Sequence, residues 1–231
     1  MIEVRGRRIL TTLSEKVDPL HSAVVMVDMQ KDFTAKGFWW DKLGQLDGDP
    51  VKNLPERMGV FLNEARRRRV RIIHLNACYD PEYLNDAMLE RMHRLDLRLE
   101  ACQAGTEGSE PHPGLEPKAG ERVVIKHRYD GFFDTDLHMQ LQAAGVKTLI
   151  VTGVAVHGCV DSTIRHAYFH GYYVVLVQDL TGGAAEDAYQ VTLDSVNLMF
   201  GVTASADEII AAWPAAAGDE AAPSDETGVA A

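Results

Sequence analysis

Three residues of complementary reactivity follow short apolar runs of the chain. Asp28 ends the run AVVMV, Lys126 ends RVVI, and Cys159 lies between the run TLIVTG and an expected helix that begins near Val160. A thiol attacks carbonyl groups as its thiolate, which needs a base to accept the proton and a positive charge to stabilise the anion. Together the three side chains would form an acyl-transfer site with Asp28 as the base, Lys126 as the charge and Cys159 as the nucleophile.

Each of these residues also has an ordinary structural interpretation. An aspartate after a strand is often a turn residue, a lysine there is often solvated, and a single cysteine is often a small buried apolar side chain. The turn from Gly153 to Cys159 adds backbone N–H groups at a helix start, a geometry that suits a tetrahedral oxyanion. Only the joint placement of the three residues at one edge favours catalysis over these alternatives.

The elements that must position these residues follow from hydrophobic periodicity. Apolar runs rich in Val and Ile predict buried parallel strands at residues 23–27, 71–75, 122–125, 148–151 and 172–177. Segments of helical period lie between them, at residues 54–65, 137–144, 160–168 and 189–200. Gly145, Gly171 and Gly201 follow three of these segments, where a positive φ ends a helix at little cost.

This alternation predicts an α/β fold, a three-layer α/β/α sandwich around a doubly wound, mainly parallel sheet of about six strands. In such sheets, ligands bind at the carboxyl ends of the strands, where Asp28, Lys126 and Cys159 are expected. Residues 77–120 are the least regular part, with one helical stretch at 87–100, and we expect an insertion over the sheet edge, either a plain surface loop or a binding loop.

Composition limits the classes of partner. The chain has 231 residues and a formal net charge of −11, which disfavours nucleic acid and anionic membranes as partners. It has no apolar run long enough to span a membrane, and its three cysteines lack CxxC spacing, so we expect a cytoplasmic protein without disulfides. We expect one domain over residues 1–213 and a disordered acidic tail over residues 214–231.

Three segments resemble the isochorismatase-like cysteine hydrolases: VMVDMQKDF around Asp28, VIKHRYDGFFDTDL around Lys126 and TGVAVHGCVDSTIRHAYFHGY around Cys159. The resemblance covers about residues 20–213 and implies an Asp-Lys-Cys triad that hydrolyses small amides through a thioester. It also implies a cis peptide between Val154 and Ala155, which turns the backbone N–H groups of Ala155 and Cys159 toward the oxyanion. The family usually forms homodimers or homotetramers, and its amidase chemistry requires no cofactor.

Within this family the segment after Lys126 looks most like the ureidoacrylate amidohydrolases, which cleave an N-carbamoyl group. Arg128 could pair with a substrate carboxylate or form a structural ion pair, and His157 could contact substrate or cap its turn. Asn197 lies on a late helix that could reach the pocket. The side chains that would wall a small flat substrate, or pack in the core instead, are Phe38, Trp40, Tyr129 and Phe133.

Several features point away from other chemistry. The segment YDPEYLNDAM after Cys78 offers no histidine pair, which disfavours a metal-dependent nicotinamidase, and His166 and His170 lack a third ligand, so we expect no metal. The basic run Arg66 to Arg69 is expected at a solvated helix end. The rival functions are hydrolysis of a vinyl ether, which does not need the thiol as nucleophile, and binding without catalysis on the same scaffold.

Overall fold

The computed structural model of the chain describes residues 1–46, 53–97, 100–183 and 186–216. Its centre is a six-stranded sheet in the order β5-β4-β3-β6-β7-β8, and every neighbouring pair is parallel. The strands are β3 (Ser22–Val27), β4 (Arg71–Ala77), β5 (Arg122–Lys126), β6 (Thr148–Val154), β7 (Tyr173–Gly182) and β8 (Val202–Ala204). The expected mainly parallel sheet of about six strands is confirmed.

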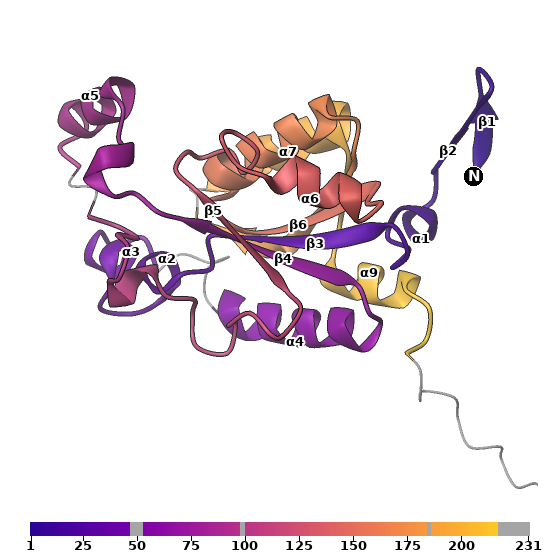
Figure 1. Cartoon of the computed structure of the whole chain (residues 1–231), viewed down its shortest axis with the longest axis horizontal. Helices are drawn as coiled ribbons and strands as arrows, with labels where there is room; N and C mark the ends of the chain where they lie inside the picture. The colour runs from indigo at the N-terminus through magenta and orange to yellow at the C-terminus, as the bar shows by residue number, and fades with distance from the viewer. Residues whose placement is uncertain (47–52, 98–99, 184–185, 217–231) are drawn as a thin grey trace, which may run out of the picture.

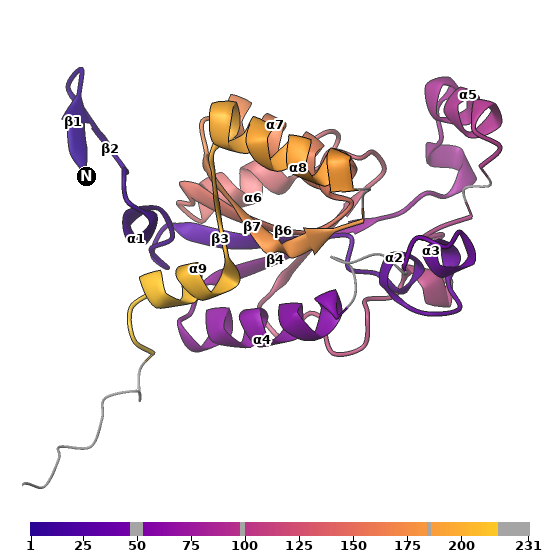
Figure 2. The same ribbon diagram turned by 180° about the vertical axis from the view of Figure 1, so that it is seen from behind.

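Helices cover both faces of this sheet, as Figures 1 and 2 show. One face carries α4 (Leu54–Arg67) and α9 (Ala206–Ala212), and the other carries α6 (Leu137–Ala143), α7 (Asp161–Phe169) and α8 (Glu186–Ser195). Each face has its own apolar core, built around Phe61 and Met58 on the α4 side and around Leu141 and Ile164 on the α7 side. The expected three-layer sandwich is therefore confirmed.

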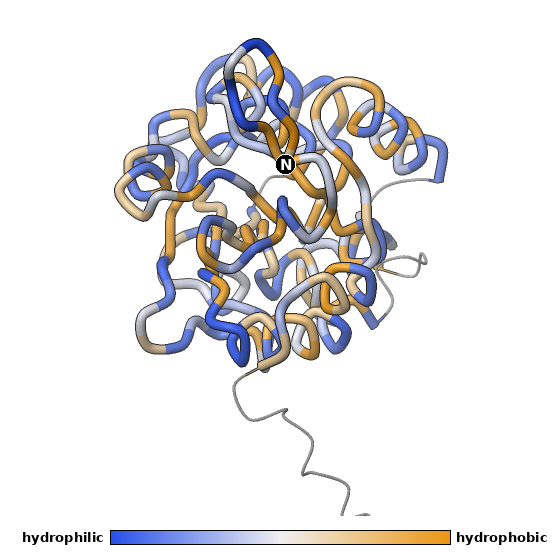
Figure 3. Tube along the Cα trace, turned by 90° about the vertical axis from the view of Figure 1, so that its right-hand side faces the viewer, coloured by the Kyte–Doolittle hydropathy of each residue, from blue (hydrophilic) through white to orange (hydrophobic). Residues whose placement is uncertain are grey.

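The helices are amphipathic, which explains why they lie on the sheet. On α4 the side chains of Leu54, Met58, Phe61, Leu62 and Ala65 are all buried, and apart from Val60 the exposed side chains are polar or charged. Figure 3 shows the same pattern as apolar and polar stretches that alternate along the outer segments of the tube. Burying the apolar stripe fixes how each helix, and the loop before it, sits over the sheet.

Three elements and one glycine differ from expectation. The N-terminal strands β1 (Ile2–Val4) and β2 (Arg7–Ile9) form a separate antiparallel hairpin. The sheet also has a sixth strand, β8, which no apolar run in the sequence predicted. Gly145 and Gly171 have the expected positive φ of 68° and 86°, but Gly201 is extended. Its smallness serves a close approach instead, because a Cβ there would lie 2.3 Å from the carbonyl oxygen of Val174.

The carboxyl ends of the strands carry the less regular segments. Short helices α2 (Lys31–Thr34) and α3 (Trp39–Lys42) follow β3, and the turn Pro81–Tyr83 and α5 (Asp86–Arg94) follow β4. The rest of the expected insertion is more than a surface loop, because Ala101, Cys102 and Leu115 are buried in the α4-side core. Glu107–Ser109 forms a further short turn, and the remaining element, α1 (Leu13–Lys16), precedes β3.

Two further expectations concern the ends and the surface of the chain. The tail expected from Pro214 lies mostly outside the described residues, and within its described part Ala216 is buried. Among the helices that the structure describes, none combines the length and the apolar character needed to cross a membrane.

Candidate active site

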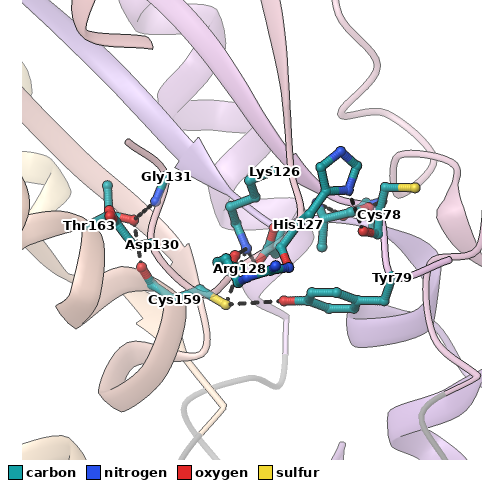
Figure 4. Close-up of polar contacts among 12 residues, drawn as sticks. Cys78, Tyr79, Lys126, His127, Arg128, Asp130, Gly131, Cys159 and Thr163 are labelled. Atoms are coloured by element: carbon teal, nitrogen blue, oxygen red, sulfur yellow. Dashed lines mark hydrogen bonds and ion pairs between the residues drawn. The ribbon is translucent and has the colours of Figure 1, made fainter. Parts of the chain in front are cut away.

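The side chains of Asp28, Lys126 and Cys159 meet at the carboxyl edge of the sheet. Asp28 follows β3, Lys126 is the last residue of β5, and Cys159 lies in the π-helical turn Val156–Val160 that follows β6. Lys126 Nζ is 2.8 Å from Asp28 Oδ2 and 3.3 Å from Cys159 Sγ. Their exposed fractions are 1%, 0% and 8%, in the order Asp28, Lys126, Cys159. Figure 4 shows Lys126 and Cys159 pointing toward each other from different elements.

The local backbone explains how three strands deliver these groups to one point. Asp28 has a φ of 53°, a left-handed conformation that aspartate tolerates, and its N–H donates to the Leu75 carbonyl at 2.8 Å. Gly153 in β6 lets the neighbouring strand come close, since a Cβ there would lie 2.0 Å from the Val27 carbonyl oxygen. The strand β3 is therefore held tightly between β4 and β6 where Asp28 leaves it.

Burial dominates the electrostatics of the three groups. It raises the pKa of Asp28, and the nearby Lys126 ammonium only partly opposes this shift. Burial also raises the pKa of Cys159 to about 12, and the Asp28 carboxylate adds to the effect while Lys126 opposes it. For Lys126 burial acts in the other direction, but the Asp28 carboxylate and, once ionised, the Cys159 sulfur outweigh it and raise its pKa. At neutral pH the thiol is protonated, beside a carboxylate with raised proton affinity and a permanent cation.

The peptide bond between Val154 and Ala155 is cis. The Ala155 carbonyl oxygen accepts hydrogen bonds from the N–H groups of Gly158 and Val160, at 3.0 and 3.1 Å. These bonds fix the start of the π-helical turn that carries Cys159. The backbone N–H groups of Ala155 and Cys159 thus belong to one short, tied segment beside the thiol.

Trp40 lies next to this segment. A Cβ on Gly183 would be 2.3 Å from the Trp40 ring and 3.5 Å from Ala155 Cα, so the indole packs on Gly183 beside Ala155. The Trp40 ring also packs edge-on against Phe33, with the centroids 5.3 Å apart, and is buried. Phe38 is half-buried at the start of the same short helix, with Lys31 Nζ 6.0 Å from its ring centroid.

Arg128, Tyr129 and Phe133 lie on the loop that follows β5. The Arg128 Nη1 group donates to the carbonyl oxygens of Tyr83 and His127, at 2.6 Å each. In the described ranges Arg128 makes no ion pair with a carboxylate, so the structural ion pair considered as an alternative does not form there. Tyr129 and Phe133 are 39% and 49% exposed, so neither packs in the core.

The other two expected substrate contacts, Asn197 and His157, lie in two different π-helical turns. Asn197 is in the π-helical turn Val196–Phe200, and its side chain holds Thr203 in β8 with bonds of 3.0 and 2.9 Å. Because this turn precedes β8, Asn197 lies at the amino end of the sheet, opposite the site, and its expected role in the pocket was wrong. His157 is on the turn with Cys159, but its side chain is exposed to solvent.

Two residues near Cys159 were missed by the sequence analysis. Tyr79 follows β4 and places its hydroxyl 3.9 Å from Cys159 Sγ. Thr163, one helical turn after Cys159, donates from Oγ1 to the Cys159 carbonyl at 2.7 Å and accepts from the Gly131 N–H at 3.0 Å. Tyr79 could have been found by extending the strand-end argument to β4, whereas the Thr163 bridge depends on a loop conformation that carries no signal in the sequence.

His166 of α7 and His170, which follows this helix, contact neighbouring side chains. His166 Nδ1 is 2.5 Å from Asp130 Oδ2, and the His166 and His170 rings stack with centroids 4.7 Å apart. In the part of the chain that the structure describes, no three side chains of the metal-binding types are grouped to hold an ion.

Known proteins are similar to this chain in sequence and in fold. The family model of the isochorismatase domain matches residues 22–208. The ureidoacrylate amidohydrolase RutB of Enterobacter sp. (strain 638) is 30% identical over 196 residues, which cover 79% of this chain and 85% of that protein. RutB of Rhizobium rhizogenes is 29% identical over 216 residues, covering 88% of this chain and 87% of that protein.

A solved structure supports the same assignment. The cysteine hydrolase from Pseudomonas syringae pv. phaseolicola 1448A superimposes with a TM-score of 0.71 and 25% identity, over 84% of this chain and 92% of that one. The family model covers most of the chain, including the segments that carry Asp28, Lys126 and Cys159. The protein therefore belongs to the isochorismatase family of hydrolases.

Proposed function

We propose that this protein is a cysteine hydrolase that cleaves a C–N bond of a small ureido acid or a related amide and releases ammonia or an amine. The observation that carries this proposal is the buried cluster in which Lys126 Nζ lies within 3.3 Å of both Asp28 Oδ2 and Cys159 Sγ. Base, cation and nucleophile are thus preassembled for acyl transfer. The similarity to ureidoacrylate amidohydrolases supports the choice of a ureido substrate.

In the first half of the reaction, the Asp28 carboxylate accepts the proton of the Cys159 thiol as sulfur attacks the substrate carbonyl carbon. The raised pKa of Asp28 favours this transfer, and the Lys126 ammonium stabilises the sulfur as its charge develops. The backbone N–H groups of Ala155 and Cys159 stabilise the oxyanion. Asp28 then returns its proton to the leaving nitrogen, the C–N bond breaks, and a thioester or carbamoyl-enzyme remains.

In the second half, water attacks the carbonyl carbon of the acyl-enzyme and gives a proton to Asp28. The C–S bond breaks, and the sulfur takes the proton back from Asp28. Lys126 keeps its proton throughout, because its raised pKa makes it a poor acid at neutral pH. The substrate and one water are the only reactants, and Asp28 returns each proton that it accepts.

The position of Arg128 favours a substrate that carries a carboxylate. Only Nη1 of its guanidinium has acceptors among the described residues, the carbonyls of Tyr83 and His127, which leaves other N–H groups for a substrate carboxylate. Trp40, beside Ala155, and the exposed rings of Tyr129 and Phe133 would wall the rest of the substrate. Changing Arg128 to Gln should therefore raise KM for ureido acids more than for their uncharged amides.

The test is ammonia release from a panel of ureido acids, simple carboxamides and nicotinamide. We expect turnover of a ureido acid by the wild type and by Cys78→Ala, which removes a thiol outside the triad, but not by Cys159→Ala. Full activity in Cys159→Ala would reject the thiol mechanism and favour hydrolysis of a vinyl ether. If no compound in the panel reacts, the ureido proposal is wrong.

Two further expectations accompany this proposal. The resemblance to the family predicts a homodimer or homotetramer, which light scattering on the purified protein tests. Cytoplasmic location stays a prediction that cell fractionation tests.

A further inference from the structure

We propose that Tyr79 is a fourth catalytic residue, whose hydroxyl donates a hydrogen bond to the Cys159 thiolate during attack. This inference rests on the proposed function, because it assigns a role in the same reaction. Tyr79 lies just after β4, is 3% exposed, and places its hydroxyl oxygen 3.9 Å from Cys159 Sγ. Figure 4 shows its side chain aimed at the sulfur from the side opposite the π-helical turn.

The direction of the hydrogen bond follows from the chemistry of the two groups. A thiolate has no proton to give, so once Asp28 has taken the thiol proton, the hydroxyl is the donor. The phenol keeps its proton, because burial and the nearby negative charges of Cys159 and Asp28 raise the pKa of Tyr79 well above its usual value. Tyr79 therefore stays a neutral donor and does not compete with Asp28 as a base.

The site needs such a donor. Burial and the Asp28 charge raise the pKa of Cys159 to about 12, so the resting thiol resists ionisation. Among the described residues, the side chains that can donate a hydrogen bond to Sγ are Lys126 at 3.3 Å and Tyr79 at 3.9 Å. Hydrogen bonds to a charged group are stronger than neutral ones, so the contact should tighten and gain energy when the thiolate forms. That gain lowers the barrier to attack.

The surroundings hold Tyr79 in this position. Its backbone N–H donates to the Cys102 carbonyl at 3.2 Å, which ties it to the buried part of the 77–120 segment. Lys126 Nζ lies 5.8 Å from the centroid of its ring, within the range of a cation–π contact. The ring thus faces the ammonium while the hydroxyl at its tip reaches the sulfur.

Tyr79→Phe tests the proposal, because it removes the hydroxyl and keeps the ring. We expect kcat to fall roughly 10- to 100-fold, as for the loss of one hydrogen bond to a charged group, with KM changed by less than about twofold. We also expect iodoacetamide to alkylate Cys159 about tenfold more slowly at pH 8.5, since less thiolate is present. Peptide mapping by mass spectrometry separates Cys159 from the other two thiols.

Tyr172→Phe is the matched control. Tyr172 is also a buried tyrosine, but its hydroxyl is 2.9 Å from His138 Nδ1 on the α7 side of the sheet, away from Cys159. We expect wild-type kcat and alkylation in this variant. An unchanged alkylation rate in Tyr79→Phe, or an equal loss in both variants, would overturn the proposal.

The alkylation assay needs no substrate, so it separates the two proposals. If the wild type hydrolyses no ureido compound but Tyr79→Phe still slows alkylation, the proposed function fails and the hydrogen bond from Tyr79 to the thiolate stands. If ureido hydrolysis is found and Tyr79→Phe keeps both rates, the proposed function stands and the role of Tyr79 fails. Thermal melts of both variants exclude unfolding as the cause of a loss.

Discussion

Two carboxylates of this molecule face cations, Asp28 fully buried and Glu121 partly buried, and their pKa values are shifted in opposite directions. Glu121 accepts hydrogen bonds from Arg66 Nε and Nη2, at 2.7 and 3.1 Å, and lies 2.8 Å from His74 Nε2. These partners outweigh the effect of burial and lower the pKa of Glu121 to about 2. Asp28 is fully buried, and burial raises its pKa more than its contacts with Lys126 Nζ at 2.8 Å, with Cys159 and with the Ala77 backbone lower it.

The difference shows what separates a structural ion cluster from a reactive one. A carboxylate surrounded by donors is stabilised as an anion and resists protonation. Lys126 divides its ammonium among Asp28, Cys159 and the Arg128 carbonyl, at 2.8, 3.3 and 3.1 Å, so Asp28 is stabilised less. A buried carboxylate with few hydrogen-bond donors can accept a proton during a reaction. Groups with such shifted pKa values are found preferentially at functional sites.

Substituting the two carboxylates should separate their roles most clearly. Asp28→Asn keeps the size of the side chain but removes the base, so we expect kcat to fall about 1,000-fold, within the range of general-base catalysis. Glu121→Gln should keep kcat within about twofold at a temperature where it is folded. Steady-state kinetics on both variants measures this contrast. An equal loss of kcat in both would show that the two carboxylates do not differ in their role in catalysis.

For the free energy of unfolding, we expect the substitution of Glu121 to have a large effect. Glu121→Gln leaves the Arg66 and His74 side chains without their anion, so we expect the free energy of unfolding to fall by about 3 kcal/mol, as for other broken buried pairs. Urea denaturation at pH 7 followed by circular dichroism measures this change. Arg67→Gln is the control, because it removes an exposed cation that contacts Glu64 on the same helix. A loss below about 1 kcal/mol in Glu121→Gln would show that the cluster adds little.

The pH dependence sharpens the same comparison. The folded pKa of Glu121 is about 2 against an ordinary value of 4.5, so its stabilisation is complete above pH 4.5 and is lost as the pH falls toward 2. The pKa of Asp28 is raised above 3.8, so the base is protonated at a higher pH than an ordinary aspartate. On acidification, kcat/KM should therefore fall before the Glu121 contribution to folding is lost. Parallel pH profiles of activity and melting temperature test this order, and coincident profiles would contradict it.

The sequence predicted the site best where topology leaves little choice. Asp28, Lys126 and Cys159 each follow an apolar strand, and parallel strands present their carboxyl ends at one edge, so their meeting needed no knowledge of the loops. Tyr79 obeys the same rule after β4. It was missed because only residues typical of nucleophilic catalysis were considered at these positions.

The errors have physical causes of another kind. The hydrophobic pattern predicts a helix at 189–200 but not the edge of the sheet toward which it runs. A helix between two parallel strands returns the chain to the amino end of the sheet, and this carries Asn197 away from the site. The strands β1, β2 and β8 have three residues each, too few for a recognisable pattern. Arg66, expected at a solvated helix end, instead bonds Glu121, 55 positions along the chain, and no local feature announces that pair.

The smallest expected effect concerns how the reactive cluster is held. Thr163 and Thr192 are both buried, and each hydroxyl donates to the carbonyl four residues earlier, on Cys159 and Ala188 respectively. Thr163 alone also accepts the Gly131 N–H, so it joins the loop after Lys126 to the turn that carries the thiol. Thr163→Val keeps the shape but leaves that N–H unpaired, and we expect kcat to fall about fivefold, whereas Thr192→Val should stay within about twofold. Equal kinetics in the two variants would mean that the cluster of Asp28, Lys126 and Cys159 is positioned by its strands alone, without help from the loop.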